Sequence, residues 1–428
     1  MSTGGDRLCP VPFVPRRDAV TLLPMKILML SATFPFPPTR GGTQVRTFNL
    51  LKGLAGHEVT LATQTDDTVT PDEIAGLRAA VSDLQVFPKP QSPSAGGVLG
   101  KAARFGQFLI GGTPPSVTAN FSAAMQAWAE AAVKAQAFDA LTCEHSVNER
   151  YVSARLQAAV PKRIVNIHSS VYGTCKQQLA SGTAEKPWRD RLNLSLLKRY
   201  EQQYCQKFTD LVVTTPEDAA QMHELCPQQP VHVVTNGVDL DLFPQRSRDP
   251  GGYHLVFIGA MDNLPNIDAA TFLAQELFPR VRQRYPAAKL SLVGSRPTAE
   301  VMALKALPGV SVTGRVPSMV DYLHQATVCV IPMRAGYGIK NNTLEAMAAG
   351  SAVVVSDRGL EGLSVDGANV PQRALRANDI EAYVAAIVQL FENLDLRATL
   401  SHNARTMIEA DYTWQQAGHT YGQILSAR

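Results

Sequence analysis

Short apolar runs alternate with longer helical patterns along most of the chain. In the first half, runs rich in Val, Ile and Leu predict strands at residues 26–31, 58–63, 140–143, 163–167, 210–214 and 231–234. Between them, apolar residues at helical spacing predict helices at residues 43–54, 121–135, 192–208 and 216–225. Near-continuous apolar strands separated by helices are typical of a parallel sheet covered on both faces.

The same alternation restarts after a polar stretch, Pro244-Gln-Arg-Ser-Arg-Asp-Pro-Gly-Gly252. The second series predicts a helix at residues 267–285 and strands at residues 254–258, 289–293, 310–313, 328–332 and 352–356. Residues 378–428 read as mostly helical. Two such series joined by a linker predict an α/β chain with two doubly wound, Rossmann-like domains. Ligands of such sheets bind outside the carboxyl ends of the strands, so candidate chemistry is sought in the loops that follow the strands.

Composition narrows the class of protein. A length of 428 residues suits two domains, and a formal net charge of +3 gives no sign of a nucleic-acid-binding surface. The six cysteines are scattered without a C-x-x-C pair, which favours a reducing, cytoplasmic compartment and argues against a metal knuckle. Residues 1–24 only loosely imitate a secretion signal, because Pro24 and Lys26 interrupt the apolar stretch; we expect a poorly ordered extension.

The most informative segment follows the strand that ends near Pro332. Its loop reads Arg334-Ala-Gly-Tyr-Gly and leads into a helix expected to begin near Asn342 and to end at Gly350. Glycines let a backbone approach a ligand, and a helix N-terminus favours phosphate. Arg334 and Lys340 flank the loop and could supply full positive charges. A purely structural alternative is a capping box, with Asn342 as the cap and Glu345 at the third helical position.

Leu344-Glu-Ala-Met-Ala-Ala-Gly350, followed by Ala352-Val-Val-Val-Ser356 and Gly359-Leu-Glu-Gly-Leu363, resembles the donor-site signature of the family 4 retaining glycosyltransferases. Further segments match that family in order along the chain: Gly41-Gly42 with Arg46, Asn236-Gly-Val-Asp239, Val256-Phe-Ile-Gly259, Leu292-Val-Gly294 and Val312-Thr-Gly-Arg-Val316. The resemblance implies the GT-B fold, in which two domains face each other across a cleft and a C-terminal helix crosses back. The expected division is residues 25–243, a linker at 244–252, a donor domain at 253–405 and the crossing helix at 406–428.

The resemblance also implies roles for individual residues. Glu345 is expected to hold the donor ribose, since a carboxylate accepts hydrogen bonds from a diol. The nucleotide is expected to meet Arg315 and Val316 at its base edge, and the same site includes Gly259, Asn263, Asn266 and Leu344. The loop beside the diphosphate and the sugar comprises Gly336, Tyr337, Gly338, Ile339, Asn341 and Asn342. On the acceptor side, the corresponding loop is formed by Gly41, Gly42 and Arg46.

Two phosphate-binding cations of the family are missing here, because Ala260 and Pro265 stand where they would fall. We therefore expect Arg334 and Lys340 to replace them. His168, just past a strand, is expected to reach the donor sugar or the reacting centre, unless a loop carbonyl simply satisfies it. The pair Glu144-His145 is either a solvated loop pair or an acceptor contact.

The implied activity is transfer of a sugar, with retention of configuration, from a UDP- or GDP-sugar to a glycan, lipid-linked or small-molecule acceptor, as in polysaccharide biosynthesis. Neither a metal nor another cofactor is expected, and nucleic acid is not an expected partner. A nucleotide-sugar epimerase and a non-catalytic sugar-nucleotide-binding paralogue are the alternatives. Residues 97–112 mix basic and apolar side chains and read either as an ordinary packed helix or as a peripheral contact with the inner face of a membrane.

Overall fold

The computed structural model describes residues 24–38, 41–90, 112–182, 184 and 186–427. The expected N-terminal extension up to residue 23 and almost all of the stretch at 97–112 lie outside the described residues. No helix among the described residues is long and apolar enough to cross a bilayer.

The first domain contains a seven-stranded parallel sheet of order β3-β2-β1-β4-β5-β6-β7. Its strands are β1 (Lys26–Ser31), β2 (Glu58–Thr65), β3 (Asp83–Pro88), β4 (Ala140–Glu144), β5 (Lys162–Asn166), β6 (Asp210–Val213) and β7 (Val231–Val233). The described helices are α1 (Gly42–Lys52), α2 (Pro71–Arg78), α4 (Pro115–Ala119), α5 (Ala123–Ala135), the 3₁₀ helix η1 (Ser146–Tyr151), α6 (Ala154–Ala159), α7 (Val171–Ser181), α8 (Pro187–Cys205) and α9 (Pro216–Leu225).

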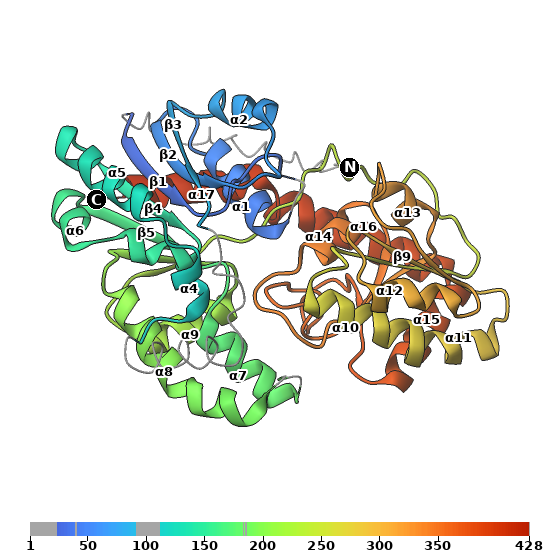
Figure 1. Cartoon of the computed structure of the whole chain (residues 1–428). Helices are drawn as coiled ribbons and strands as arrows, with labels where there is room; N and C mark the ends of the chain where they lie inside the picture. Colours follow the sequence, from blue (N-terminus) through green and yellow to red (C-terminus); the bar gives the residue numbers. More distant parts are fainter. Residues whose placement is uncertain (1–23, 39–40, 91–111, 183, 185, 428) are drawn as a thin grey trace, which may run out of the picture.

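The second domain contains a six-stranded parallel sheet of order β10-β9-β8-β11-β12-β13. Its strands are β8 (His254–Ile258), β9 (Lys289–Val293), β10 (Val310–Val312), β11 (Val328–Ile331), β12 (Ala352–Val355) and β13 (Leu375–Arg376). Its helices are α10 (Leu264–Phe272), the π-helical turn η2 (Leu273–Leu277), α11 (Phe278–Arg284), α12 (Ala299–Ala303), the 3₁₀ turn η3 (Leu304–Ala306), α13 (Val320–Gln325), α14 (Asn341–Ala348), α15 (Ile380–Glu392) and α16 (Leu394–Asp411). Figure 1 shows the two domains beside each other, each with helices around its own sheet.

This architecture confirms the predicted pair of doubly wound domains. Sequence reasoning missed β3 and β13. β3 lies at an edge of its sheet and alternates poorly in burial, and β13 is only two residues long. The helix predicted at residues 267–285 begins earlier, at Leu264, because Pro265 suits a first helical turn, where its missing N–H has no partner to lose. It also contains the π-helical turn η2, which no periodicity in the sequence announces.

The end of the chain belongs to the first domain. α16 continues through the expected boundary at 405/406, and its buried residues Ala404, Met407 and Ile408 pack in the core of the second domain. The chain then crosses at Thr413, which pairs with Val238, and α17 (Trp414–Ser426) packs on α1. Figure 1 shows α17 among the elements of the first domain.

Two glycines allow that packing. A Cβ added to Gly53, just after α1, would lie 2.3 Å from the Cα atom of Gly418 in α17. The helix backbones therefore touch at this point, and Trp414 and Tyr421 enter the core of the first domain on either side of it.

We expect Gly418→Ala to lower the free energy of unfolding by about 1–3 kcal/mol, because its Cβ would lie 2.7 Å from Gly53 Cα and force the helices apart. Gly422→Ala, in the same helix, is the matched control: its Cβ would meet Gly53 only at 3.7 Å, so it should be neutral or stabilising by up to about 1 kcal/mol. Urea unfolding of both variants measures the difference. Equal losses for the two variants would show that the contact of α1 with α17 is not the cause.

Candidate functional site

The carboxyl ends of the strands carry the candidate chemistry, as the fold class requires. The loop at residues 332–340 leaves β11 and enters α14, and two of its glycines adopt positive φ, Gly336 at 113° and Gly338 at 68°. Side chains rarely adopt these angles, so the loop conformation itself requires glycine at both positions.

The start of α14 differs from the predicted capping box. The helix begins at Asn341, one residue earlier than expected, and no side chain caps it. Asn342 instead donates from its amide to the carbonyl of Ile258, at 3.3 Å, and Thr343 donates to the carbonyl of Gly359. The alternative with Asn342 as a cap is therefore wrong, because its side chain ties α14 to Ile258, the last residue of β8.

Lys340 lies inside the loop rather than beside open space. Its ammonium is buried, donates to the carbonyl of Gly338 and lies 3.2 Å from the Glu361 carboxylate. Burial lowers the pKa of Lys340, and Glu361 opposes that shift. Glu361 also pairs with Arg358 at 2.7 Å. Lys340 thus closes the loop and neutralises a buried carboxylate.

Arg334 is half-exposed at the other end of the loop. Its Nε atom donates to Asp268 Oδ2 at 2.9 Å, its Nη2 atom bonds Oδ1, and its guanidinium stacks on Phe272, 4.6 Å from the ring centre. Asp268 and Phe272 belong to α10, so Arg334 is held beside the first turns of the helix that follows β8. Its hydrogen bond to Asp268 raises the pKa of Arg334, which stays fully charged.

Glu345 is partly exposed on α14, and burial around its carboxyl group raises its pKa to about 8. Among the described residues, none donates a hydrogen bond or contributes a salt bridge to this carboxyl group. A desolvated carboxyl without a partner is costly in a folded protein, which points to a ligand that completes it.

The other expected nucleotide-site residues surround these groups with different roles. A Cβ on Gly294 would lie 1.6 Å from the carbonyl oxygen of Gly259, and Asn266 shapes the same loop by donating to the carbonyl of Ala260. Asn263 precedes α10 without a side-chain capping bond. Arg315 is exposed and Val316 is half-buried. The side chains of Leu344 and Ile339 pack in the core, so only their backbone can meet a ligand.

Arg46, expected in an acceptor loop, is buried at the centre of a polar chain between the domains. It donates to Asn166 Oδ1 at 2.9 and 3.1 Å and to Asn236 Oδ1 at 2.8 Å. Asn236 in turn donates to Asn341, the first residue of α14, at 2.8 Å. Burial lowers the pKa of Arg46 to about 10. The other two residues of the expected acceptor loop differ in their surroundings. A Cβ added to Gly42 would meet no atom within 4 Å, whereas a Cβ added to Gly41 would lie 3.0 Å from Gln44 Oε1.

The polar chain continues into the first domain. Asn166 donates to Glu144 at 2.9 Å, and Tyr421 of α17 donates to the same carboxyl group at 2.7 Å. Glu144 is fully buried, and burial raises its pKa. A solvated loop role for Glu144 is therefore wrong.

His168 lies beside His145, with ring centres 5.1 Å apart. Burial lowers the pKa of both rings, so both are neutral near pH 7, and no described group bonds His168 Nε2, which is buried. His145 also has a positive φ of 86°, uncommon for a non-glycine residue. Among the described residues, no loop carbonyl accepts a hydrogen bond from His168, so the alternative of a histidine satisfied by such a carbonyl has no support.

The loop also touches the first domain directly. A Cβ on Gly338 would lie 2.5 Å from Thr214 Oγ1, at the end of β6. The Tyr337 hydroxyl lies near Asp218 of α9, and burial together with that carboxyl raises the pKa of Tyr337. A Cβ on Gly362 of the second domain would lie 2.7 Å from Thr215 Cγ2, just before α9. The two domains therefore meet at the candidate site itself.

Two family models match the chain in tandem: Glycosyltransferase Family 4 over residues 40–242 and Glycosyl transferases group 1 over residues 252–393. This chain belongs to these glycosyltransferases.

The fold of this glycosyltransferase is similar to that of solved GT-B enzymes. Sucrose-phosphate synthase from Thermosynechococcus elongatus aligns with a TM-score of 0.68 at 18% identity, over 93% of this chain and 98% of that chain. HepE from Anabaena in complex with UDP and glucose aligns at 0.63 and 14%, over 94% and 100%. A S. aureus TarM variant in complex with fondaparinux, α-GlcNAc-glycerol and UDP aligns at 0.62 and 12%, over 94% and 100%. No curated protein matches the sequence.

Sequence reasoning did not identify Glu361 and Asp268, the carboxylates that pair with Lys340 and Arg334 in the loop of this glycosyltransferase. Glu361 stands in the quoted Gly359-Leu-Glu-Gly-Leu363, after the strand next to β11, so adjacency of the two loops was a usable signal. Asp268 gave no signal, because its contact depends on how α10 packs. Among the described residues, no group of three or more His, Cys, Asp or Glu side chains could hold a metal ion.

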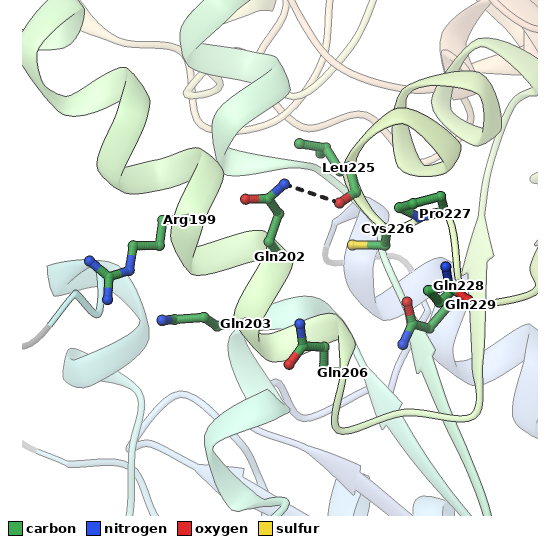
Figure 2. A pocket seen from close by; sticks show the side chains of 9 residues that line it. All are labelled: Arg199, Gln202, Gln203, Gln206, Leu225, Cys226, Pro227, Gln228 and Gln229. Carbon is green, nitrogen blue, oxygen red and sulfur yellow. Dashed lines mark hydrogen bonds between the residues drawn. The ribbon is translucent and has the colours of Figure 1, made fainter.

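A pocket of about 500 Å³ lies elsewhere in the glycosyltransferase, between the end of α8 and the segment after α9. Figure 2 shows glutamine side chains around it, with Gln202 donating to the carbonyl of Leu225. It adjoins residues that precede β6 and β7, so it lies at the edge of the sheet opposite to the candidate site.

The two loop cations should respond differently to removal. Lys340→Ala leaves the buried carboxylate of Glu361 without its lysine partner. We therefore expect the free energy of unfolding to fall by about 3 kcal/mol or more. Arg334→Ala removes a half-exposed pair and should cost below about 1 kcal/mol. Thermal and urea unfolding measure both variants.

The double variant Lys340→Ala/Glu361→Ala is the control, because it removes the stranded carboxylate and should recover part of the lost stability. If Lys340→Ala were as stable as the wild type, Lys340 would not be the structural partner of Glu361.

Proposed function

We propose that this glycosyltransferase moves a sugar from a UDP- or GDP-sugar to a glycan or lipid-linked acceptor, with retention of configuration and without a metal. The names of the similar structures support a nucleotide-sugar donor: HepE is solved with UDP-glucose and TarM with UDP. The donor occupies the second domain and the acceptor approaches from the first.

The observation that carries the proposal is the unpartnered carboxyl group of Glu345. The ribose of a nucleotide offers two adjacent hydroxyl donors, which suit a group that only accepts when ionised. Hydrogen bonds to a charged group contribute about 1.5–3 kcal/mol each, enough to draw the proton from a carboxyl whose pKa is about 8. Donor binding and ionisation of Glu345 are thus coupled.

The diphosphate would lie at the N-terminus of α14, beside the two loop glycines. A helix N-terminus stabilises negative charge, and Arg334 adds a full positive charge from the side of α10. Lys340 contributes indirectly, by holding the loop closed. In this arrangement, Arg334 is the cation that meets the leaving group, and Lys340 positions the backbone.

His168 serves the donor sugar as a neutral group. Since its pKa lies well below 6.5, the imidazole can accept or donate a hydrogen bond without bringing charge to the reacting centre. No side-chain base is assigned; the leaving phosphate itself would take the acceptor proton. Contact of the domains at Gly338 and Thr214 would exclude water, which would otherwise hydrolyse the donor.

A thermal-shift panel of UDP, GDP, ADP, CDP and dTDP tests the donor site. We expect UDP or GDP to raise the melting temperature most, because a ligand that binds only the folded state stabilises it in proportion to its affinity. Glu345→Gln should weaken that nucleotide by about tenfold or more. Glu381→Gln, an exposed glutamate of the same domain, is the control.

Equal nucleotide shifts in wild type and Glu345→Gln would remove Glu345 from the site. Incubation of the best donor without acceptor extends the test: an isomeric product would show an epimerase instead, and binding without any turnover on added acceptors would show a non-catalytic paralogue.

The pH dependence of stability gives a second test of Glu345. The folded protein keeps a proton on this carboxyl up to about pH 8, whereas the unfolded chain releases it near 4.5, so wild type loses stability as pH rises between these values. Glu345→Gln has no proton to release. We therefore expect the melting temperature of the variant, relative to that of wild type, to rise by a few degrees as the pH increases from about 5 to about 8.

Other titrating groups are shared by the two proteins and cancel in the comparison. A difference in melting temperature that stays flat across this range would contradict the desolvated state of Glu345.

A further inference from the structure

The helical hairpin of α7 and α8 extends beyond the sheet of the first domain. Ser170, just past β5, donates to Glu201 of α8 at 2.7 Å, so Glu201 lies level with the carboxyl edge of the sheet. The preceding residues of α8, 187–200, span roughly 20 Å at 1.5 Å per residue. Figure 1 shows this hairpin reaching out from the first domain on the side where the second domain lies.

The far end of α8 exposes large apolar side chains. Trp188 is 67% exposed, more than any other large apolar residue described, and Leu192 is 64% exposed. They are four residues apart, so they lie on one face of the helix, one turn from each other. Their side chains together give this end of α8 a small exposed apolar patch.

The same face of α8 is basic. Arg191, Lys198 and Arg199 are exposed, and none makes an ion pair with a described residue. Helical spacing places Arg199 in line with Trp188 and Leu192, with Arg191 and Lys198 along one flank. Arg199 is also one of the residues that line the pocket near the end of α8, as Figure 2 shows.

Negative charge on the described part of the hairpin is small. Its carboxyl groups are Asp190, which pairs with Arg189 at 2.8 Å, and Glu201, which is buried. The exposed face therefore combines apolar tips with uncompensated positive charge, the combination that binds the headgroup region of anionic lipid.

We propose that the face formed by Trp188, Arg191, Leu192, Lys198 and Arg199, here called the α8 face, docks on an anionic lipid surface. The hairpin begins directly after His168, at the candidate site. A docked α8 face would therefore bring the cleft to the membrane, where a lipid-linked acceptor resides; this last consequence rests on the proposed function.

A second copy of the chain fits the α8 face less well. Two identical basic faces repel each other in a symmetric contact, and two apolar side chains cover far less than the roughly 1,000 Å² that a stable protein interface needs. The charge on the face thus favours lipid over self-association.

Co-sedimentation with vesicles tests the proposal, using phosphatidylcholine alone and phosphatidylcholine with about one third phosphatidylglycerol. Wild type should bind the anionic vesicles only, and less in high salt. Arg191→Glu/Arg199→Glu should weaken binding about twentyfold or more, at about fivefold per basic residue removed from the surface. Trp188→Ser/Leu192→Ser should weaken it about tenfold or more, since the apolar anchor is lost.

Matched controls carry the same changes elsewhere. Leu394→Ser removes an exposed leucine of the second domain, and Lys52→Glu/Lys134→Glu reverses two exposed charges away from the α8 face. Both should bind like wild type. Wild-type Trp fluorescence should shift to the blue on anionic vesicles, and Trp188→Phe should abolish that shift.

Equal binding by wild type and both α8-face variants overturns the proposal, as does binding that ignores lipid charge. If size exclusion showed a dimer for wild type and a monomer for the variants, the α8 face would be assigned to a protein contact instead. The nucleotide thermal shift, measured on the same variants, should stay unchanged. Loss of lipid binding with an intact nucleotide shift concerns the α8 face alone, whereas a missing nucleotide shift in wild type concerns the donor site alone.

Discussion

The buried guanidinium of Arg46 is the constraint on which the two-domain arrangement depends. A desolvated cation must be satisfied by fixed acceptors, and Arg46 finds them in Asn166 of the first domain and Asn236 of the connection between domains. Asn236 also donates a hydrogen bond to Asn341, so the same set of hydrogen bonds places the first residue of α14. The position of the loop at residues 332–340 therefore depends on a chain of hydrogen bonds that begins in the first domain.

A second consequence concerns charge near the candidate site. Lys340 and Glu361 neutralise each other, so the positive charge beside the loop comes from Arg358, which also pairs with Glu361, from Arg334 at the rim and from the N-terminus of α14. A cation that is already paired and stacked is also oriented before a ligand arrives, which lowers the entropy lost on binding.

Sequence patterns were sufficient for the architecture, because near-continuous apolar strands and a polar linker report directly on burial. They placed β8 and β9 at the observed residues, but failed for β13, which is too short to carry a pattern. The sequence predicted which segments form the candidate site, but not the contacts that their side chains make. Lys340, Arg334 and Arg46 were singled out, yet each meets a partner, Glu361, Asp268 or Asn166, that only the packing of distant elements supplies.

The docking of α17 on α1 has a consequence for synthesis on the ribosome. The core of the first domain contains Trp414, Tyr421, Ile424 and Leu425, which are translated only after the second domain. Until they emerge, the nascent first domain exposes the apolar face of α1 that α17 covers in the folded protein. The first domain therefore completes its core only after the second domain has been synthesised, although its sheet is made first, and a chaperone could bind that face in the interval.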